Sequence, residues 1–271
     1  MVKQHPVTSA ATPGIPTVMH VGFAGARKPF DSCAYPGLDA GWLSASLVPL
    51  LQAELDGLRE TLGLMEPYFP CGVSSLASGA DTLFTQACQA LQWPQRLFLP
   101  QQRNDFLAGV SKSGSPDFTD AQAATARELL QSPHIIEERV ASDALERVER
   151  FQDVNLEIMA LADVVVCLLP ADAPAGKPGG TAEFLQHAID NRLPALELRI
   201  QISETGIPTL QATWHNKNAF QRPMPPTALA GLKLQRTGIP TMEAFCASLK
   251  AHSSQRAQWQ HRKEALAGRE A

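Results

Sequence analysis

Three glycine-bearing turns are the part of this sequence best suited to chemistry, and each follows an apolar run typical of a buried strand. Glycine lets a backbone approach a phosphate closely, and the free N–H groups and dipole at a helix start favour an anion. In chain order the turns are Gly22-Phe-Ala-Gly25-Ala-Arg27, Ser75-Leu-Ala-Ser-Gly79-Ala-Asp81 and Gly176-Lys-Pro-Gly179-Gly180-Thr181-Ala-Glu183. Together they predict a nucleotide pocket.

The elements that carry these turns alternate between strand and helix. Apolar runs predict strands at 18–23, 73–76, 96–99, 164–169 and 194–200, with a short one at 134–139. Apolar periodicity predicts helices at 42–63, 80–91, 120–131, 142–161 and 182–189. Such repeated β-α-β units predict an α/β fold with a Rossmann-like open, mainly parallel sheet and helices on both faces. Since ligands bind beyond the carboxyl ends of parallel strands, the three turns are expected to converge there.

The domain organisation follows from where this alternation begins and stops. With 271 residues and 44% hydrophobic content, the chain can bury one full core and carry a modest appendage. The predicted parts are an N-terminal extension at 1–16, a nucleotide-binding domain at 17–200, an irregular Pro-rich connection with a closing helix near 240–249 within 201–250, and a polar tail or linker at 251–271.

Composition narrows the classes of partner. The formal net charge of −4 gives no basic footprint, which makes a nucleic-acid partner unfavourable and leaves a small nucleotide-derived ligand. No apolar run approaches the ~20 residues of a membrane span and the N-terminus has no signal-type stretch, so the expected location is cytoplasmic. The five cysteines lack CxxC spacing, so we expect core thiols and neither a disulfide framework nor a metal site. No cofactor is indicated.

With the strand ending in Leu99-Pro100 and the Ala162-Asp-Val-Val-Val run, these turns resemble the SLOG superfamily. That superfamily joins sensors related to the SMF/DNA-processing protein A group with the LOG ("Lonely Guy") phosphoribohydrolases, and the resemblance covers residues 17–200. It implies a domain that binds a nucleotide or nucleotide-sugar, often related to ADP-ribose. Some relatives are receptors in bacterial antiphage signalling, coupled to an effector; others cleave the N-glycosidic bond of nucleoside monophosphates. A homo-oligomer or an associated effector is compatible with either.

Carried over by position, the resemblance implies specific ligand-binding residues. They are Gly22, Ala24, Gly25, Arg27, Ser78, Gly79, Asp81, Gly179, Gly180 and Thr181, with Glu183 beside the phosphate cradle as the single candidate catalyst.

The departures from the enzyme pattern concern Glu183. The phosphoribohydrolase pattern Pro-Gly-Gly-x-Gly-Thr-x-x-Glu has its glutamate where this chain has Phe184. The glutamate of this chain, Glu183, lies one position earlier. On a helix this shift turns the side chain by about 100°, so Glu183 need not face a ribose as a general acid or base must. The family's upstream arginine falls near Val154 or Asn155. These departures favour a binding sensor, with a nucleoside 5′-monophosphate phosphoribohydrolase as the alternative. Single-stranded DNA binding, suggested by the DNA-processing relatives, is a second alternative that the acidic balance disfavours.

Overall fold

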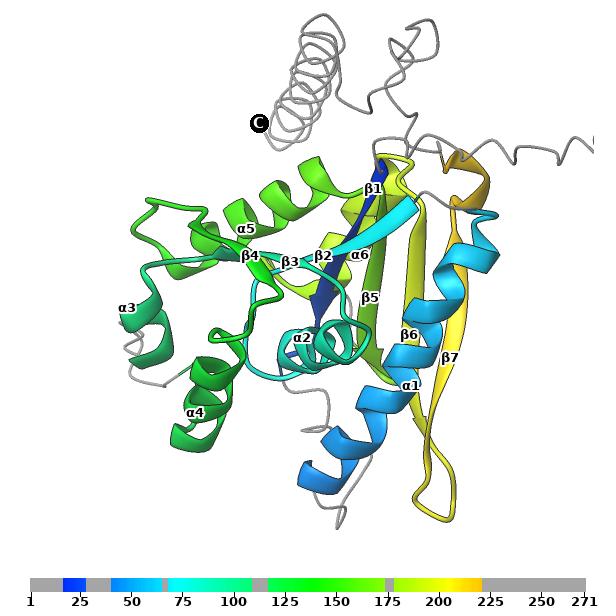
Figure 1. Ribbon diagram of the computed structural model, residues 1–271, viewed down its shortest axis with the longest axis horizontal. Helices are drawn as coiled ribbons and strands as arrows, with labels where there is room; N and C mark the ends of the chain where they lie inside the picture. Colours follow the sequence, from blue (N-terminus) through cyan, green and yellow to red (C-terminus); the bar gives the residue numbers. More distant parts are fainter. Residues whose placement is uncertain (1–16, 28–39, 65–67, 109–116, 174–177, 221–271) are drawn as a thin grey trace, which may run out of the picture.

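The computed structural model describes residues 17–27, 40–64, 68–108, 117–173 and 178–220 (Figure 1). The strands in this part of the chain are β1 (Thr17–Gly25), β2 (Tyr68–Ser74), β3 (Gln95–Leu99), β4 (Ile135–Val140), β5 (Val164–Pro170), β6 (Ala195–Ile202) and β7 (Pro208–His215). The helices there are α1 (Ala40–Thr61), α2 (Ala80–Ala90), α3 (Arg103–Ala108), α4 (Asp120–Leu129), α5 (Arg147–Leu161), α6 (Thr181–Asp190) and the 3-10 turn η1 (Lys217–Ala219).

The described strands form one sheet in the order β4-β3-β2-β1-β5-β6-β7. Neighbours pair in parallel except β6 and β7, which are antiparallel. The chain builds outward from β1 through β2 and β3 to β4, then returns to the other side of β1 with β5. The strand order therefore reverses between β1 and β5, the point at which open α/β sheets leave a crevice for ligands. The predicted fold class, an open and mainly parallel α/β sheet, is confirmed.

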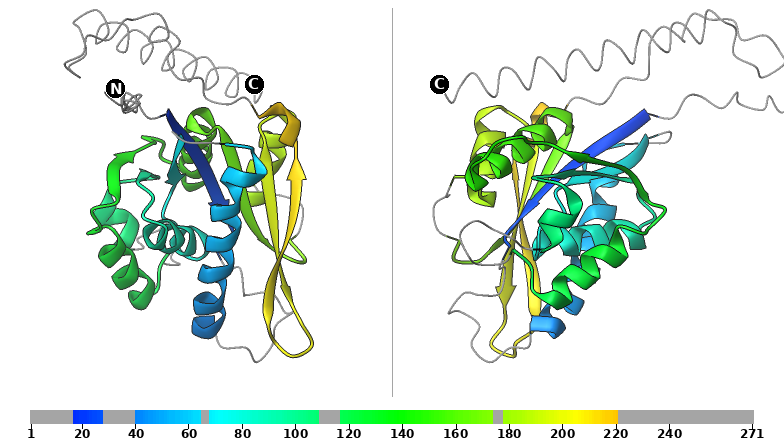
Figure 2. Two further views of the ribbon diagram at one scale, coloured as in Figure 1. Left: turned by 45° about the vertical axis from the view of Figure 1, so that its right-hand side comes forward. Right: turned by 90° about the vertical axis from the view of Figure 1, so that its left-hand side faces the viewer.

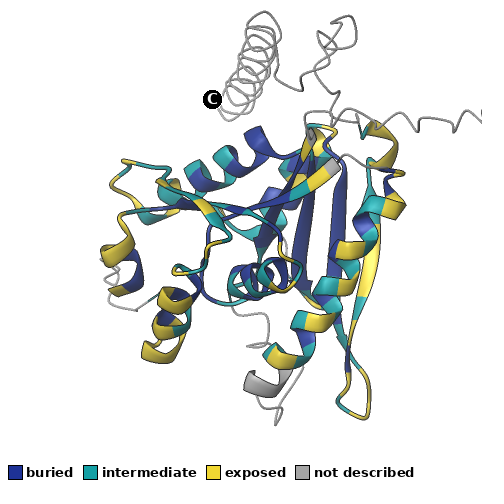
Figure 3. Ribbon diagram, viewed as in Figure 1, coloured by how far each residue is buried: buried dark blue, intermediate teal, exposed yellow. Residues whose placement is uncertain are grey.

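Helices cover both faces of the sheet, and the alternation along β1 shows how the faces divide. Met19, Val21 and Phe23 join a buried cluster with α1 and α2. Gly22 and Ala24 point to the other face, against α5 and the cluster that α5 forms with α6. Figure 2 shows these layers on opposite sides of the strands. Because β5 is covered on both sides, its residues 164–169 are all buried (Figure 3), which explains its unbroken apolar sequence.

A third apolar cluster lies at the β3 and β4 side of the sheet. Leu97 and Leu99 of β3 pack there against α3 and α4, with Phe106 and Phe118 in edge-to-face contact. The Gln89 side chain of α2 donates to the carbonyl of Leu129 at 3.1 Å and so joins α2 to α4. The short helix α3 had no counterpart among the sequence predictions.

Most predicted elements are found close to their expected positions, but the helix predicted at 142–161 starts later. α5 begins at Arg147, and Ser142 makes a local turn instead of a cap, accepting the N–H of Ala144. The apolar side chains of Leu145 and Val148 would fit the buried face of a helix, but they are 75% and 45% exposed. Met159, further along α5, is buried.

Strand β7 corrects the prediction of an irregular connection after residue 200. It pairs along β6 from Ile202↔Pro208 to Ala195↔His215, so the sheet extends beyond the predicted domain end. Pro208 favours irregular structure, but proline is tolerated at the first residue of a strand. Half of the residues of this strand are exposed, and its Leu210 and Trp214 pack only partly on the α1 cluster, so its apolar signal is weak.

Other predictions have mixed outcomes. Cys71, Cys88 and Cys167 are buried and free, as expected of core thiols. The extension at 1–16, the closing helix near 240–249 and the tail at 251–271 lie outside the described residues. Within the described ranges, no helix combines the length and the apolar character that crossing a bilayer requires.

Candidate functional site

A cavity lies where the strand order reverses, at the carboxyl ends of β1 and β5. Its volume is about 460 Å³, inside the ~300–1,000 Å³ range of small-molecule pockets. Its wall takes residues from the turn after β1, the β2–α2 connection, helix α5 and the turn before α6. Among them are Ala24, Gly25, Arg27, Ser75, Asp81, Phe151, Asn155, Gly179, Gly180 and Thr181. The three sequence turns thus meet at one place.

The first turn depends on glycine for close packing. A Cβ on Gly25 would lie 2.2 Å from the Cβ of Ala80, at the start of α2. A Cβ on Gly22 would lie 2.8 Å from that of Ala162, so Gly22 lets α5 pack on β1 and does not line the cavity. The backbone leaving β1 is therefore pressed against α2 on one side of the sheet and α5 on the other.

The second turn is tied to the first by Asp81, in the first turn of α2. Its buried carboxylate accepts the N–H of Gly25 at 3.0 Å and the N–H of Ala77 at 3.3 Å. The hydroxyl of Ser75 also donates to this carboxylate, at Oδ2 of Asp81. Burial raises the pKa of Asp81 to about 6, against the lowering effect of these hydrogen bonds and of Arg27.

Gly79 completes the junction of these two turns. Its φ of +93° is in the region that favours glycine, and a Cβ there would lie 2.2 Å from the carbonyl oxygen of Arg27. The N–H of Ala80 donates to the carbonyl of Ala26 at 3.1 Å, so the start of α2 is occupied by protein backbone. Gly79 and Ser78 shape the turns and do not line the cavity.

The third turn brings the start of α6 to the cavity wall. Gly179 has a φ of +74°, and Gly180 is the N-cap residue of α6. The first N–H groups of a helix have no partner within the helix, and Gly180 has no side chain that could accept from them. Because Gly180 and Thr181 both line the cavity, this helix start is suited to an anion within it.

Glu183, the candidate catalyst, is engaged inside this turn. Its Oε2 accepts the N–H of Gly179, and its Oε1 lies 3.9 Å from Nε2 of His187, one helical turn further along. Glu183 is not on the cavity wall. Its carboxylate therefore stabilises the turn and offers no group to a sugar in the cavity.

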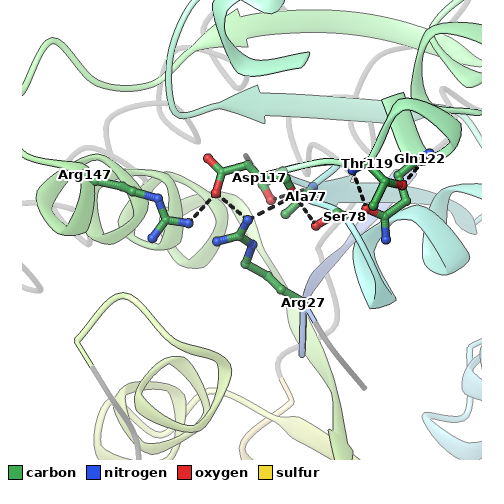
Figure 4. Close-up of polar contacts among 8 residues, drawn as sticks. Arg27, Ala77, Ser78, Asp117, Thr119, Gln122 and Arg147 are labelled. Carbon is green, nitrogen blue, oxygen red and sulfur yellow. Dashed lines mark hydrogen bonds and ion pairs between the residues drawn. The ribbon is translucent and has the colours of Figure 1, made fainter. Parts of the chain in front are cut away.

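A cluster of charges adjoins the cavity beside Phe151. The Asp117 carboxylate, 10% exposed, lies between the guanidinium groups of Arg27 and Arg147 (Figure 4). Nη2 of Arg147 donates to Oδ1 of Asp117 at 2.5 Å, and Nη2 of Arg27 donates to the same oxygen. Arg27 also donates to the backbone carbonyl of Asp117 at 3.1 Å, and the Ser78 hydroxyl donates to that carbonyl at 2.7 Å.

Both arginines stack on the Phe151 ring. The guanidinium carbons of Arg27 and Arg147 lie 5.7 Å and 5.0 Å from its centroid, within the range of cation–π contact. Phe151 itself lines the cavity. The ring thus connects the charged cluster to the cavity wall.

The structure brings together most of the residues predicted from the sequence. Those on the cavity wall are Ala24, Gly25, Arg27, Asp81, Gly179, Gly180 and Thr181. Their contact with a ligand remains a prediction. The others do not line the cavity, because they pack elements together or hold a turn: Gly22, Ser78, Gly79 and Glu183.

The list of ligand-binding residues predicted from the sequence contains none from α5. Arg147, Phe151, Asn155 and Ile158 are spaced by four, four and three residues, so they form one stripe of the helix. Phe151, Asn155 and Ile158 line the cavity, and Arg147 lies over the Phe151 ring. This spacing was a usable signal, but Asp117 had none, since its role depends on contacts 90 and 30 residues away.

Comparisons with known proteins add little to what the structure shows. No protein-family model matches the chain, and no curated protein matches it. Among solved structures, the chain is similar to the X-ray structure of DNA processing protein A (DprA) from Streptococcus pneumoniae, with 15% sequence identity and a TM-score of 0.35. The alignment covers 67% of this chain and 50% of that chain, so the chain spans about half the length of the DprA structure.

Proposed function

We propose that this protein is a binding domain of the SLOG type, which holds a nucleotide or nucleotide-sugar such as ADP-ribose without cleaving it. One observation carries the proposal: the turns after β1 and β5, with Asp81 from the first turn of α2, line a single cavity at the reversal of strand order. Open α/β sheets bind nucleotides at this position, and the α6 start and Arg27 supply donors for an anion.

The polarity of the wall suits such a ligand. Apolar side chains such as Phe151 and Ile158 cover part of it and offer surface to a base. Asn155 and Thr181 supply side chains that can hydrogen-bond hydroxyl or phosphate oxygens. Apolar walls with a few placed polar groups are typical of ligand pockets.

Two observations weigh against the alternatives. The glycosidase alternative needs a free carboxylate facing the ribose, but Glu183 is bonded to the N–H of Gly179 outside the cavity wall. Single-stranded DNA binding needs a long basic groove, whereas the chain has a net charge of −4 and its cavity has a volume of about 460 Å³.

Calorimetry with ADP-ribose, its cyclic isomers, NAD and AMP tests the proposal. At least one of these should bind the full chain with a dissociation constant in the micromolar range. Ala173→Trp, which fills the cavity from its wall, should abolish that binding. Ala90→Trp, on the exposed end of α2, is the matched control and should leave it unchanged. Binding of none of the panel at millimolar ligand, or equal binding by the Ala173 variant, contradicts the proposal.

Chromatography of the same mixtures separates binding from cleavage. The proposal expects AMP and ADP-ribose to be recovered intact. Release of free adenine that stops in Glu183→Ala would support the phosphoribohydrolase alternative. A gel shift of single-stranded DNA at low salt, retained in Ala173→Trp, would support the nucleic-acid alternative.

A further inference from the structure

We infer that the ligand of this cavity carries at least two anionic groups, one at the start of α6, at Gly180 and Thr181, and a second held by Arg27 and Arg147. The ligand class is therefore a nucleotide with a diphosphate, free or linked to a sugar, and a nucleoside monophosphate is a poor ligand. This specificity concerns the same cavity and so rests on the proposed function.

The charge of the cluster is the first support. Two guanidinium groups share one carboxylate, that of Asp117, so these three residues together carry one net positive charge. Arginine forks match carboxylate and phosphate geometry, and paired arginines are a common way to hold a phosphate. The Asp117 carboxylate marks a position between the two arginines that an anion can occupy.

Unused donors are the second support. The Nε–H groups of Arg27 and Arg147 are buried, yet neither has a hydrogen-bond partner among the residues that the structure describes. Buried polar groups nearly always have a partner, and an unpaired one next to a cavity calls for a ligand, an ion or water. A phosphate offers several acceptor oxygens and could engage donors of both arginines at once.

The position of Phe151 is the third support. Its ring lies under both guanidinium groups, and a Cβ built on Gly179 would lie 3.2 Å from the Phe151 Cβ. The arginine cluster and the α6 turn therefore flank the same side chain. A diphosphate offers one phosphate to each of these two places.

Calorimetry of the full chain with AMP, ADP, GMP and GDP tests this specificity. For the base that binds, the diphosphate should bind about tenfold tighter than the monophosphate. Hydrogen bonds to the second, charged phosphate account for an increase in affinity of this size. Arg147→Ala should remove most of this preference. It should weaken the binding of the diphosphate about tenfold and the binding of the monophosphate less than about twofold. Arg103→Ala removes the same charge at an exposed ion pair with Glu138, outside the cavity, and should change neither.

A second variant keeps the inference testable if Arg147→Ala does not fold. Asp117→Asn removes the competing negative charge and keeps the backbone carbonyl to which Arg27 and Ser78 donate. It should bind the diphosphate more tightly, and unchanged or weaker binding overturns the inference. Equal affinity of mono- and diphosphate in the unaltered protein also overturns it but leaves the proposed function intact. If none of these nucleotides and no member of the ADP-ribose panel binds, both the inference and the proposed function are contradicted.

Discussion

The carboxylate of Asp81 accepts a hydrogen bond from the N–H of Gly25 at 3.0 Å, across 56 residues of sequence. This bond joins the turn after β1 to the start of α2, two segments on the wall of one cavity. Because the same carboxylate also accepts from Ser75 and Ala77, it fixes the conformation of both turns. A buried acid in this position couples the shape of the site to pH.

The first prediction concerns the pH dependence of stability. The pKa of Asp81 is about 6 in the folded protein and about 3.9 in an unfolded chain. Between these values the folded state binds more protons, so the free energy of unfolding falls as the pH rises from 4 to 7. The contribution is on the order of 3 kcal/mol. Asp81→Asn lacks this titration, so urea unfolding should show its stability rising relative to the unaltered protein over that interval.

The matched control is Asp56→Asn, at an exposed carboxyl of α1. Its stability should run parallel to that of the unaltered protein across the same pH interval. A parallel course for Asp81→Asn as well would show that burial does not raise the pKa of Asp81.

The second prediction compares two glycines. Gly79→Ala places a Cβ 2.2 Å from the carbonyl oxygen of Arg27 and forces a residue with a side chain into a φ of +93°. We expect it to lower the free energy of unfolding by about 2–4 kcal/mol and to weaken nucleotide binding. Gly57→Ala, inside α1 with nothing within 4 Å of its Cβ position, should raise stability by about 0.5–1 kcal/mol. Equal effects in thermal unfolding would contradict the role given to Gly79.

The main elements of the fold could be predicted because burial leaves a strong pattern. The strand β5 is covered on both faces and is apolar throughout. The end of α1 is marked by Gly63, which has a positive φ, and the N–H of Leu64 after it donates to the carbonyl of Arg59. β7 escaped prediction because an exposed antiparallel strand buries few side chains. Its first residue, a proline, further masked the signal.

Only the backbone turns of the candidate site could be predicted from the sequence. Glycine turns are visible in a sequence because their conformation demands glycine, as at Gly79 and Gly179. Charged partners are not visible in the same way. Asp117 meets Arg27 and Arg147 only because α5 and the segment before α4 lie beside the first turn, and no local pattern encodes that arrangement.

The third prediction concerns Glu183. Its carboxylate accepts the N–H of Gly179 and so closes the turn before α6. Glu183→Ala should lower the free energy of unfolding by about 1–2 kcal/mol, because it leaves that N–H without its acceptor. Chromatography should detect no free base from AMP with either protein. His187→Ala, which removes the 3.9 Å contact but leaves the Glu183 carboxylate bonded to the N–H of Gly179, is the control and should lower stability less than Glu183→Ala does.

The fourth prediction concerns Arg199 of β6, which acts on the cavity without lining it. Its Nε donates to Glu197 at 2.6 Å and its Nη1 donates to the carbonyl of Ala171 at 3.1 Å, in the chain that leaves β5 along the cavity. Arg199→Met should lower the free energy of unfolding by about 1 kcal/mol and weaken nucleotide binding about threefold, because the wall after β5 is less firmly held. His215→Gln disturbs the other partner of Glu197, at 2.7 Å, but does not reach Ala171. It should cost similar stability and leave calorimetric affinity unchanged, so an equal loss of affinity in both variants would show that Arg199 does not support the wall.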